Sequence, residues 1–344
     1  MAPRTAIILA AGYGRRLGSG GPKCLVPVDG EPILHRAIRN LAAVGVRDVF
    51  VVVGHGAEEI IARTGDRLAE ISVHYVHSDA AEFTNNAYSL WLARAHLDGD
   101  VFVLDGDIAF DPEIPALLAA QAAPAVTAVA PWGAGMNGTG VVLDDGLVVE
   151  IVLAGEQPGA AAPPFETVNI HLPRADYLAT EFLPRLEALI ARGEWNAFYD
   201  TVLAETVNQA RVPMRAVDCR DIRWQEIDDR TDLAAADWLF MTPADRLNRL
   251  NRQHGGYWRH EVTDHSLLYN AHFPSEGLWE RLTANLRPAL ANYPVGQETL
   301  CELLAAAIGQ PAARLAVANG ASELIKILAQ LLDDTVLPVP GFHE

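Results

Sequence analysis

Lysine is scarce in this chain: among 344 residues it occurs only as Lys23 and Lys326, and the formal net charge is -18. Proteins that hold nucleic acid do so through clustered Lys and Arg against the phosphate backbone, so broad nucleic-acid binding is not expected. A small anionic ligand is still compatible with an acidic protein, because it needs only a local positive pocket. Lys23 is therefore the first candidate for such a pocket.

Cysteines and long apolar runs are also few. Cys24, Cys219 and Cys301 show no metal-ligand spacing, and any disulfide scheme leaves one of them unpaired, which favours a reducing, cytoplasmic setting. The apolar run near the N-terminus spans about seven residues before glycines and arginines follow. It is too short for a signal peptide or a membrane span, so neither export nor a membrane partner is expected.

The chain does have enough apolar residues for a folded core. Half of its residues are hydrophobic and a fifth are charged, which is an ordinary globular composition. Its length exceeds the ~100–200 residues of a single domain, so one large domain and a smaller piece are expected. We predict a large domain over 1–240, a helical linker over 241–265 that starts at a Thr-Pro pair, and a smaller domain over 266–344.

Short apolar runs alternate with helical patterns through the first half of the chain. This alternation predicts the α/β class, with a doubly wound, mostly parallel sheet. The runs are apolar almost throughout, as expected for strands that are covered on both faces. The predicted strands are Thr5–Ala10, Asp48–Val53, Ile71–Val76, Val101–Leu104 and Ala125–Ala130, and the predicted helices between them include Pro32–Val44 and Asn86–Leu97.

The pattern changes after Gly140. Residues 140–172 predict a β-hairpin insertion followed by a Gly/Ala/Pro-rich loop and a further strand-like run. Helices are then predicted at Tyr177–Ala191 and Ala197–Gln209, and strands at Val212–Asp218 and Ile222–Ile227. A partial α/β extension ends the chain, with predicted helices at Gln297–Ile308 and Ser322–Leu332 and a strand at Arg314–Ala318.

A glycine-rich loop follows the first predicted strand, within IILAAGYGRRLGSGGPKCLVPVDGEPIL from Ile7 to Leu34. Glycines there let backbone N–H groups approach a phosphate chain closely, and Arg15, Arg16 and Lys23 add positive charge. The spacing fits neither the GxxxxGK[ST] loop nor GxGxxG, so those two motifs do not apply. A glycine-rich turn with surface cations is the simpler alternative.

Two pairs of carboxylates suggest a metal site. Asp105 and Asp107 follow a buried strand, and ligands bind at the carboxyl ends of parallel strands. Glu226 and Asp228 stand two apart in IRWQEIDDRTDL, so both can point at one ion, and oxygen ligands suit Mg²⁺. An Asp-Gly turn and a charged edge strand are the alternatives for these two segments.

The string from Ile7 to Leu34 resembles the signature loop of the MobA-like nucleotidyltransferases that activate sugar phosphates and phosphocholine. The resemblance implies a Rossmann-like fold in which Arg15 grips the phosphates and Lys23 contacts the α-phosphate and the nucleophile. It implies that Asp107, Glu226 and Asp228 hold Mg²⁺. The nucleotide would be bound by Leu9, Ala10, Ala11, Gly12, Gly14 and Asp105.

The segment EFTNNAYSLWLA narrows the resemblance. Asn85, Asn86 and Ser89 stand at the start of a predicted helix, where they can cap it or bond a pyrimidine edge. The N-N-x-x-S-L string resembles the CTP:phosphocholine and CTP:phosphonate cytidylyltransferases, which implies CTP as the donor. ETVNIHL resembles that family's acceptor segment, although it can equally be a plain strand. The residues expected near the acceptor are Glu166, Asn169 and Tyr199, with Phe198 and Asp200 as further candidates for meeting an amine.

The C-terminal region carries a second resemblance. LAVANGASELIKILAQLL resembles the opening of a fold-type I aminotransferase of the histidinol-phosphate branch. There a helix N-terminus meets the phosphate of PLP, which implies that role for Gly320, Ala321 and Ser322. PLP is expected only with a complete domain, since the family's Schiff-base lysine would lie beyond residue 344. The alternative is a helical docking extension.

These features predict a Mg²⁺-dependent transfer of CMP from CTP to a phosphonate such as 2-aminoethylphosphonate, with release of pyrophosphate. The acceptor oxygen is already anionic, so no dedicated general base is expected. A phosphocholine acceptor, a sugar-1-phosphate acceptor and a non-catalytic nucleotide-binding regulatory module are the alternatives, and a homodimer remains open.

Overall fold

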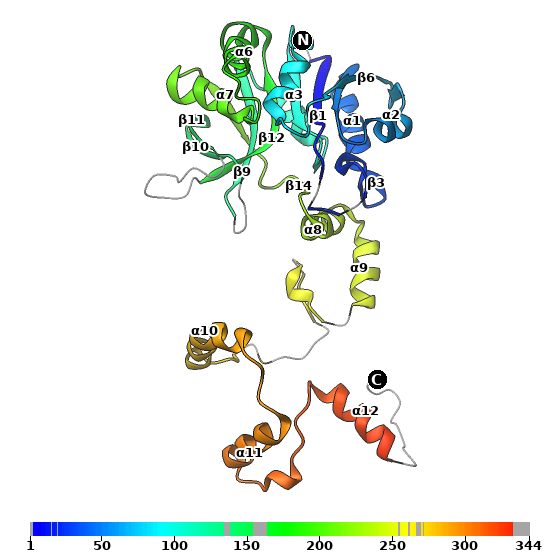
Figure 1. The fold of residues 1–344 in the computed structure, drawn as a ribbon, viewed down its shortest axis with the longest axis vertical. Coiled ribbons are helices and arrows are strands. Elements are labelled where there is room, and N and C mark those ends of the chain that lie inside the picture. The colour runs from blue at the N-terminus through cyan, green and yellow to red at the C-terminus, as the bar shows by residue number, and fades with distance from the viewer. Residues whose placement is uncertain are drawn as a thin grey trace. The chain divides into compact units, whose positions relative to one another are not determined.

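The protein is described by a computed structural model for residues 3–14, 16–18, 20–133, 138–153, 164–253, 255–260, 262–265, 270 and 272–332. The chain separates into two compact units, Met1–His254 and Gly255–Glu344, which are described in turn (Figure 1). The division falls after residue 254, between the predicted boundaries at 240 and 265, so both boundaries stay predictions. Among the described residues, no helix is long and apolar enough to cross a membrane.

The first unit is built on a ten-stranded sheet with the order β10-β11-β13-β9-β12-β7-β1-β4-β6-β5. β1 pairs in parallel with β4 and β7, whereas β12 runs antiparallel between β7 and β9. The predicted α/β class is therefore confirmed, with a mixed sheet in which β7, β1, β4 and β6 pair in parallel, as do β9 and β13. The strands are β1 Thr5–Ala10, β4 Asp48–Val53, β5 Arg67–Leu68, β6 Ile71–His77, β7 Val101–Asp105, β9 Ala125–Pro131, β10 Gly140–Asp144, β11 Leu147–Val152, β12 Phe165–Pro173 and β13 Met214–Asp218.

Helices cover both faces of this sheet, because alternate side chains of its inner strands face opposite ways. In β1, Ile8 packs into the core on the α1 and α4 side, and Ile7 packs into the core on the α3, α6 and α7 side. Both isoleucine side chains are fully buried. The helices of this unit are α1 Ile33–Ala43, α2 Ala57–Thr64, α3 Asn86–Leu92, α4 Glu113–Ala119, α5 Ala175–Tyr177, α6 Leu183–Ala191, α7 Asp200–Ala204, α8 Arg230–Phe240 and α9 Pro243–Arg252.

Short elements connect these helices. The π-helical segments Leu178–Phe182 and Glu205–Gln209 continue α5 into α6 and extend α7, so the predicted helices at 177–191 and 197–209 correspond to composite helices. Single 3-10 turns lie at Lys23–Leu25 and Arg94–His96. The predicted hairpin is formed by β10 and β11 at the edge of the main sheet, and 154–163 of the loop after it lie outside the described residues.

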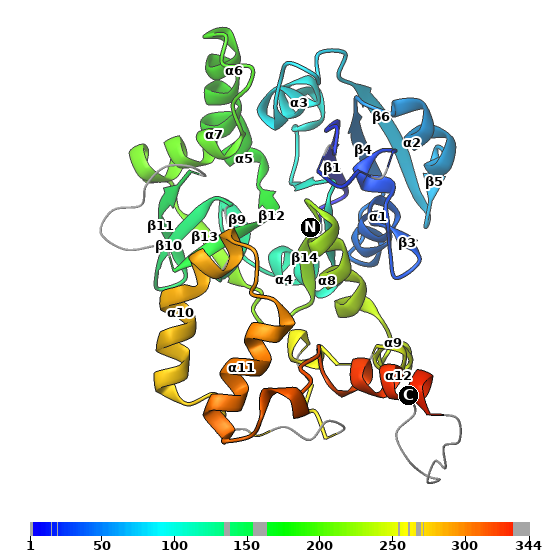
Figure 2. The same ribbon diagram turned by 60° about the horizontal axis from the view of Figure 1, so that its bottom comes forward.

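Two small ladders lie apart from the main sheet. β14 (Trp224–Glu226), which is the core of the strand predicted at 222–227, pairs antiparallel with β8 (Ile108–Phe110), and β2 (Pro27–Val28) pairs with β3 (Glu31–Pro32). A third apolar cluster holds them beside α8, with Val28, Ala109 and Ile227 at its centre. Both views show α8 next to β14 (Figure 1, Figure 2). This packing fixes the segment that carries Glu226 and Asp228.

The second unit is helical where it is described. It contains α10 Glu276–Ala291, α11 Gln297–Ile308 and α12 Ala321–Leu331, with 3-10 turns at Tyr257–Arg259 and Ala312–Arg314. The strand predicted at 314–318 is wrong: a turn occupies its start, and its apolar residues find no neighbouring strand to pair with among the described residues. Of the described residues in α10, α11 and α12, only Cys301 is buried.

Candidate active site

The loop after β1 forms one wall of a cavity of about 610 Å³. Leu9, Ala10, Ala11 and Gly12, for which nucleotide binding is predicted, all line this cavity. Gly14 is not among the lining residues. Its φ is +55°, and a Cβ there would stand 2.8 Å from the Cβ of Lys23. Glycine at this position therefore allows the backbone to pack closely against Lys23.

The two arginines of this loop differ in what the structure shows of them. Arg15 lies outside the described residues, so its predicted phosphate contact is not tested. Arg16 lines the cavity instead, and its Nη1 donates a hydrogen bond to Asp228 Oδ2 at 3.2 Å. The family resemblance assigned the phosphate contact to Arg15 alone. Arg16 is the next residue in the same loop, so the sequence also offered it as a candidate.

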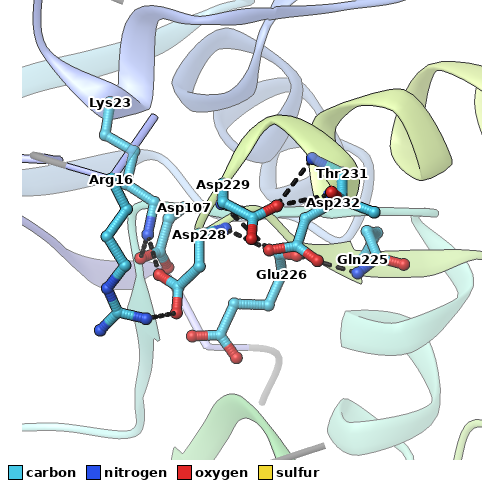
Figure 3. A network of polar contacts seen from close by, with 9 residues as sticks. All are labelled: Arg16, Lys23, Asp107, Gln225, Glu226, Asp228, Asp229, Thr231 and Asp232. Atoms are coloured by element: carbon cyan, nitrogen blue, oxygen red, sulfur yellow. Dashed lines mark hydrogen bonds and ion pairs between the residues drawn. The ribbon is translucent and has the colours of Figure 1, made fainter. Parts of the chain in front are cut away.

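Lys23 stands at the start of the turn after Pro22, and only 13% of its side chain is exposed. Its Nζ donates hydrogen bonds to Asp107 Oδ2 at 2.7 Å and to Asp228 Oδ1 at 2.6 Å (Figure 3). Burial by itself would lower the pKa of this ammonium group, but the two carboxylates outweigh it and raise the pKa above its ordinary value. Lys23 is therefore a fixed positive charge at the centre of the cavity.

Three carboxylates from two distant segments surround this charge. Asp107 follows β7, Glu226 ends β14, and Asp228 precedes α8, and one ligand oxygen from each lies within 4.8 Å of the others. The pairing of Ile108 with Glu226, and a 3.0 Å hydrogen bond from the Ile227 N–H to the Asp107 carbonyl, join the two segments. The sequence shows each pair, but this pairing of β8 with β14 is what unites them.

The acidic cluster fits a divalent cation. Its three donors are carboxylate oxygens, which hard cations such as Mg²⁺ prefer. Asp107 Oδ1 is buried without a hydrogen-bond partner in the described part of the chain, so it is available as a ligand. Burial, together with the charges of Asp107 and Asp228, raises the pKa of Glu226 to about 8, and burial and Asp107 raise that of Asp105. A bound cation would relieve this repulsion.

Helix α8 holds Asp228 in place through its own N-terminus. Asp229 is the N-cap, and its side chain accepts from the N–H groups of Thr231 and Asp232. Asp232 Oδ2 in turn accepts from the N–H groups of Asp228 at 2.9 Å and Asp229 at 3.0 Å (Figure 3). This capping box fixes the backbone that presents Asp228.

The start of α3 forms the opposite wall. Asn85, Asn86 and Ser89 all line the cavity. Asn85 is the N-cap, and its side chain accepts from the Asn86 N–H, while Asn86 Oδ1 accepts from the backbone N–H of Tyr199 at 2.9 Å. Both asparagines thus have structural contacts and also face the cavity, so a pyrimidine contact remains a prediction.

The predicted acceptor residues divide into three kinds. Asn169 lines the cavity from an irregular point in β12, where its φ is +54°. Glu166 lies behind that wall, where it accepts a hydrogen bond from the N–H of Gly138, and burial raises its pKa to about 7. Tyr199 does not reach the cavity: it is 1% exposed, and its ring packs edge-on against His171 at 5.5 Å.

The neighbours of Tyr199 take its place in the lining. Phe198, Asp200 and Thr201 line the cavity at the start of α7, together with Thr139 beside them. Adjacent residues at a helix start point in different directions, and only the phase of the helix decides which of them faces a ligand. Asp105 also lines the cavity, and its Oδ1 is buried without a hydrogen-bond partner in the described chain.

The remaining predicted site lies in the second unit. Gly320 precedes α12, and Ala321 and Ser322 form its first turn. The N-cap of this helix is Gly320, and no side-chain hydrogen bond caps it there. The predicted PLP contact is not supported by any comparison below, and it is not carried into the function proposed for the first unit.

Known proteins resemble the chain at three levels. Residues 6–207 match the family described as the MobA-like NTP transferase domain. CMP-5'-(3-aminopropyl)phosphonate synthase of Streptomyces rubellomurinus is 41% identical over 349 residues, which cover 99% of this chain and 55% of that protein. Bifunctional protein GlmU of Dinoroseobacter shibae is 31% identical over 244 residues, covering 69% of this chain and 53% of that one. The chain spans about half the length of the curated relatives it matches.

Two solved structures share the fold. CTP:phosphocholine cytidylyltransferase from Streptococcus pneumoniae superposes with a TM-score of 0.58 at 20% identity, over 69% of this chain and all of that one. The inositol-1-phosphate CTP transferase from T. maritima superposes with a TM-score of 0.54 at 20% identity, over 70% of this chain and 99% of that one. At this level of identity the likeness concerns the fold alone.

Proposed function

Because the chain belongs to the MobA-like NTP transferase domain family, we propose that it transfers CMP from CTP to an aminoalkyl phosphonate such as 2-aminoethylphosphonate. The observation that carries this proposal is the placement of Lys23 between Asp107 and Asp228, with Glu226 beside them, in one cavity. The choice of CMP and of a phosphonate is supported by the 41% identical relative, which is named as a CMP-aminopropylphosphonate synthase.

The reaction joins two anions, so the protein's task is alignment and charge neutralisation. A phosphonate oxygen forms a bond to the α-phosphorus of CTP, and the bond from that phosphorus to the bridging oxygen breaks, which releases pyrophosphate. The attacking oxygen is already ionised, so no side chain has to remove a proton from it. Lys23 presents its charge to the α-phosphate, and Arg16 presents a second charge from a largely exposed side chain.

The metal requirement follows from the acidic cluster. Asp107, Glu226 and Asp228 would hold Mg²⁺, which when bound supplies positive charge to the phosphate oxygens and offsets the charge of the carboxylates. The backbone of Ala11 and Gly12 approaches the nucleotide without side-chain obstruction, since nothing in the described chain lies within 4 Å of a Cβ placed on Gly12. Asn85, Asn86 and Ser89 face the base.

The test is a coupled assay of pyrophosphate release with 31P NMR of the product. CTP, UTP, ATP and GTP are each offered with 2-aminoethylphosphonate, 3-aminopropylphosphonate, phosphocholine and glucose-1-phosphate, in the presence of Mg²⁺. We expect a phosphoric–phosphonic anhydride of CMP, and loss of the reaction with EDTA. Asp228→Asn serves as the inactive control. The absence of pyrophosphate with every pair would leave the regulatory-module alternative standing and would refute the proposed transfer.

A further inference from the structure

The cavity contains one buried carboxylate that the transfer of CMP does not use. Asp200 lines the cavity at the first residue of α7, yet it is only 5% exposed. The Thr139 hydroxyl donates a hydrogen bond to its carboxylate, but Asp200 Oδ1 has no hydrogen-bond partner in the described chain. No described Lys or Arg forms an ion pair with it.

A buried carboxylate with an open oxygen is costly unless a ligand supplies its partner. The partner that suits it is a cation with N–H donors, since a hydrogen bond between opposite charges is stronger than a neutral one. An anionic phosphate or a neutral sugar hydroxyl would leave the charge of Asp200 uncompensated. The chemistry of this wall is therefore complementary to an ammonium group.

An aromatic ring next to Asp200 strengthens this reading. Phe198 also lines the cavity, and half of its surface is exposed, so a ligand can reach it. A cation over an aromatic face is attracted by the ring's negative quadrupole. Glu166 adds a second acidic group beside Gly138, where it is 7% exposed. Negative charge and an open ring thus meet on the wall that Thr139 and Asp200 share, whereas Lys23 and Arg16 supply the positive charge for phosphates.

We propose that Asp200 and Phe198 form a subsite that binds an ammonium group; this proposal rests on the proposed CMP transfer. This subsite selects acceptors that carry a cationic amine at the end remote from the phosphonate. Lys23 and the acidic cluster act on the phosphorus end, and Asp200 determines specificity at the other end. The subsite would thereby account for the preference for zwitterionic aminoalkyl phosphonates over alkyl phosphonates that lack the ammonium group.

The test compares acceptors that differ only in the ammonium group. 2-Aminoethylphosphonate is paired with propylphosphonate, and 3-aminopropylphosphonate with butylphosphonate, in steady-state assays of CMP transfer. We expect the wild type to prefer each amine by roughly 10- to 100-fold in kcat/KM, which is the value of one charge-assisted hydrogen bond. Asp200→Asn should remove this preference by raising KM for the amines, so that kcat/KM for each amine falls to that of its matched alkyl phosphonate.

Two further variants separate specificity from folding. Asp176→Asn is the matched control, because it makes the same change at an exposed position of α5 and should alter neither acceptor. Phe198→Leu removes the ring at a half-exposed position, so it should fold even if Asp200→Asn does not, and it should weaken the amine preference.

Three outcomes would overturn the subsite. Equal use of amine and alkyl acceptors by the wild type would show that no ammonium subsite exists, while CMP transfer itself would stand. An equal loss of both acceptors in Asp200→Asn and no change in Phe198→Leu would assign Asp200 a purely structural role. No product with any phosphonate would refute the proposed function as well.

Discussion

Lys23 neutralises the acidic cluster from within the cavity. Its Nζ bonds Asp107 and Asp228, the same carboxylates that would hold a divalent cation. In the absence of a nucleotide, the ammonium group and the metal ion therefore compete for one set of oxygens. A nucleotide would resolve the competition, since its phosphates give Lys23 another partner.

Lys23→Met tests this competition. We expect turnover to fall by about 100- to 1,000-fold, the usual cost of one lost donor to a transition-state oxyanion. Without nucleotide, Mn²⁺ should bind the variant more tightly than the wild type, as measured by calorimetry, because the competing ammonium group is gone. Lys326→Met removes the other lysine of the chain and should change neither quantity. Weaker Mn²⁺ binding to Lys23→Met would contradict the competition.

His171 is a second residue whose charge state is constrained. It is buried, neither ring nitrogen has a hydrogen-bond partner in the described chain, and burial lowers its pKa from 6.5 to about 4. Between those pH values the unfolded chain binds a proton that the folded chain does not, so stability falls as the pH falls from 6.5 to 4.

His171→Phe removes this titration and keeps an aromatic ring. Relative to the variant, the wild type should lose about 3 kcal/mol of unfolding free energy between pH 6.5 and pH 4. Urea unfolding of both proteins at several pH values measures the difference, and taking that difference cancels the other titrating groups, Asp200 among them. Parallel pH profiles for the two proteins would show that His171 titrates normally in the fold.

At the scale of elements, the antiparallel pair of β8 and β14 and the first turn of α8 assemble the cation site. Asp232 is central because its Oδ2 accepts from the N–H groups of both Asp228 and Asp229. Loss of a group that hydrogen-bonds and orients a metal ligand typically weakens metal binding by about 10- to 100-fold. A variant of this cap should therefore affect the site more than it affects the fold.

Asp232→Ala is expected to weaken Mn²⁺ binding by about 10-fold or more and to cost about 1 kcal/mol of stability. Thr242→Ala is the matched control. Thr242 caps α9 by accepting from the Asp245 N–H, so its loss should cost a similar stability without any change in Mn²⁺ affinity. Calorimetric titration and thermal unfolding measure the two quantities. Equal Mn²⁺ affinities for both variants would show that the cap does not orient Asp228.

Much of this element-level arrangement could be predicted from the sequence. β1 and β4 have the predicted bounds, because unbroken apolar runs flanked by turn residues leave little choice. The antiparallel insertion of β12 between β7 and β9 could not be predicted, since strand partners are set by tertiary packing. For the same reason, the pairing of β8 with β14 was not expected, and the meeting of Asp107 with Glu226 and Asp228 was expected only through a family resemblance.

At the scale of the whole molecule, an acidic protein is expected to bind anions only where positively charged side chains gather in one place. The chain carries a net charge of -18, yet Lys23 and Arg16 converge on one cavity of the first unit. Every described residue that lines this cavity belongs to the first unit. The second unit contributes none of the described lining residues, so its stability can be considered apart from the site.

The helices of the second unit have apolar stripes that remain exposed. Trp279, Leu282, Leu286 and Leu290 lie along one face of α10, with exposed fractions from 49% to 79%. Leu300, Leu303 and Leu304 follow a similar spacing on α11. Isolated helices of 11 to 16 residues are marginal in water, because packing of such a face supplies most of their stability.

We therefore expect the amide protons of α10, α11 and α12 in the 344-residue chain to exchange with solvent within seconds to minutes, on the scale of local opening. Those of β1, β4 and β7 should exchange far more slowly, because these strands lie in the middle of a sheet with fully buried side chains. Hydrogen exchange read by mass spectrometry compares both sets of peptides in one sample, so the strands are an internal control. Repeating the experiment at several protein concentrations distinguishes two causes of protection. Slow exchange in α10 that appears only at high concentration would mean that a second copy covers its stripe, whereas slow exchange at every concentration would contradict the prediction that these helices are marginal in this chain.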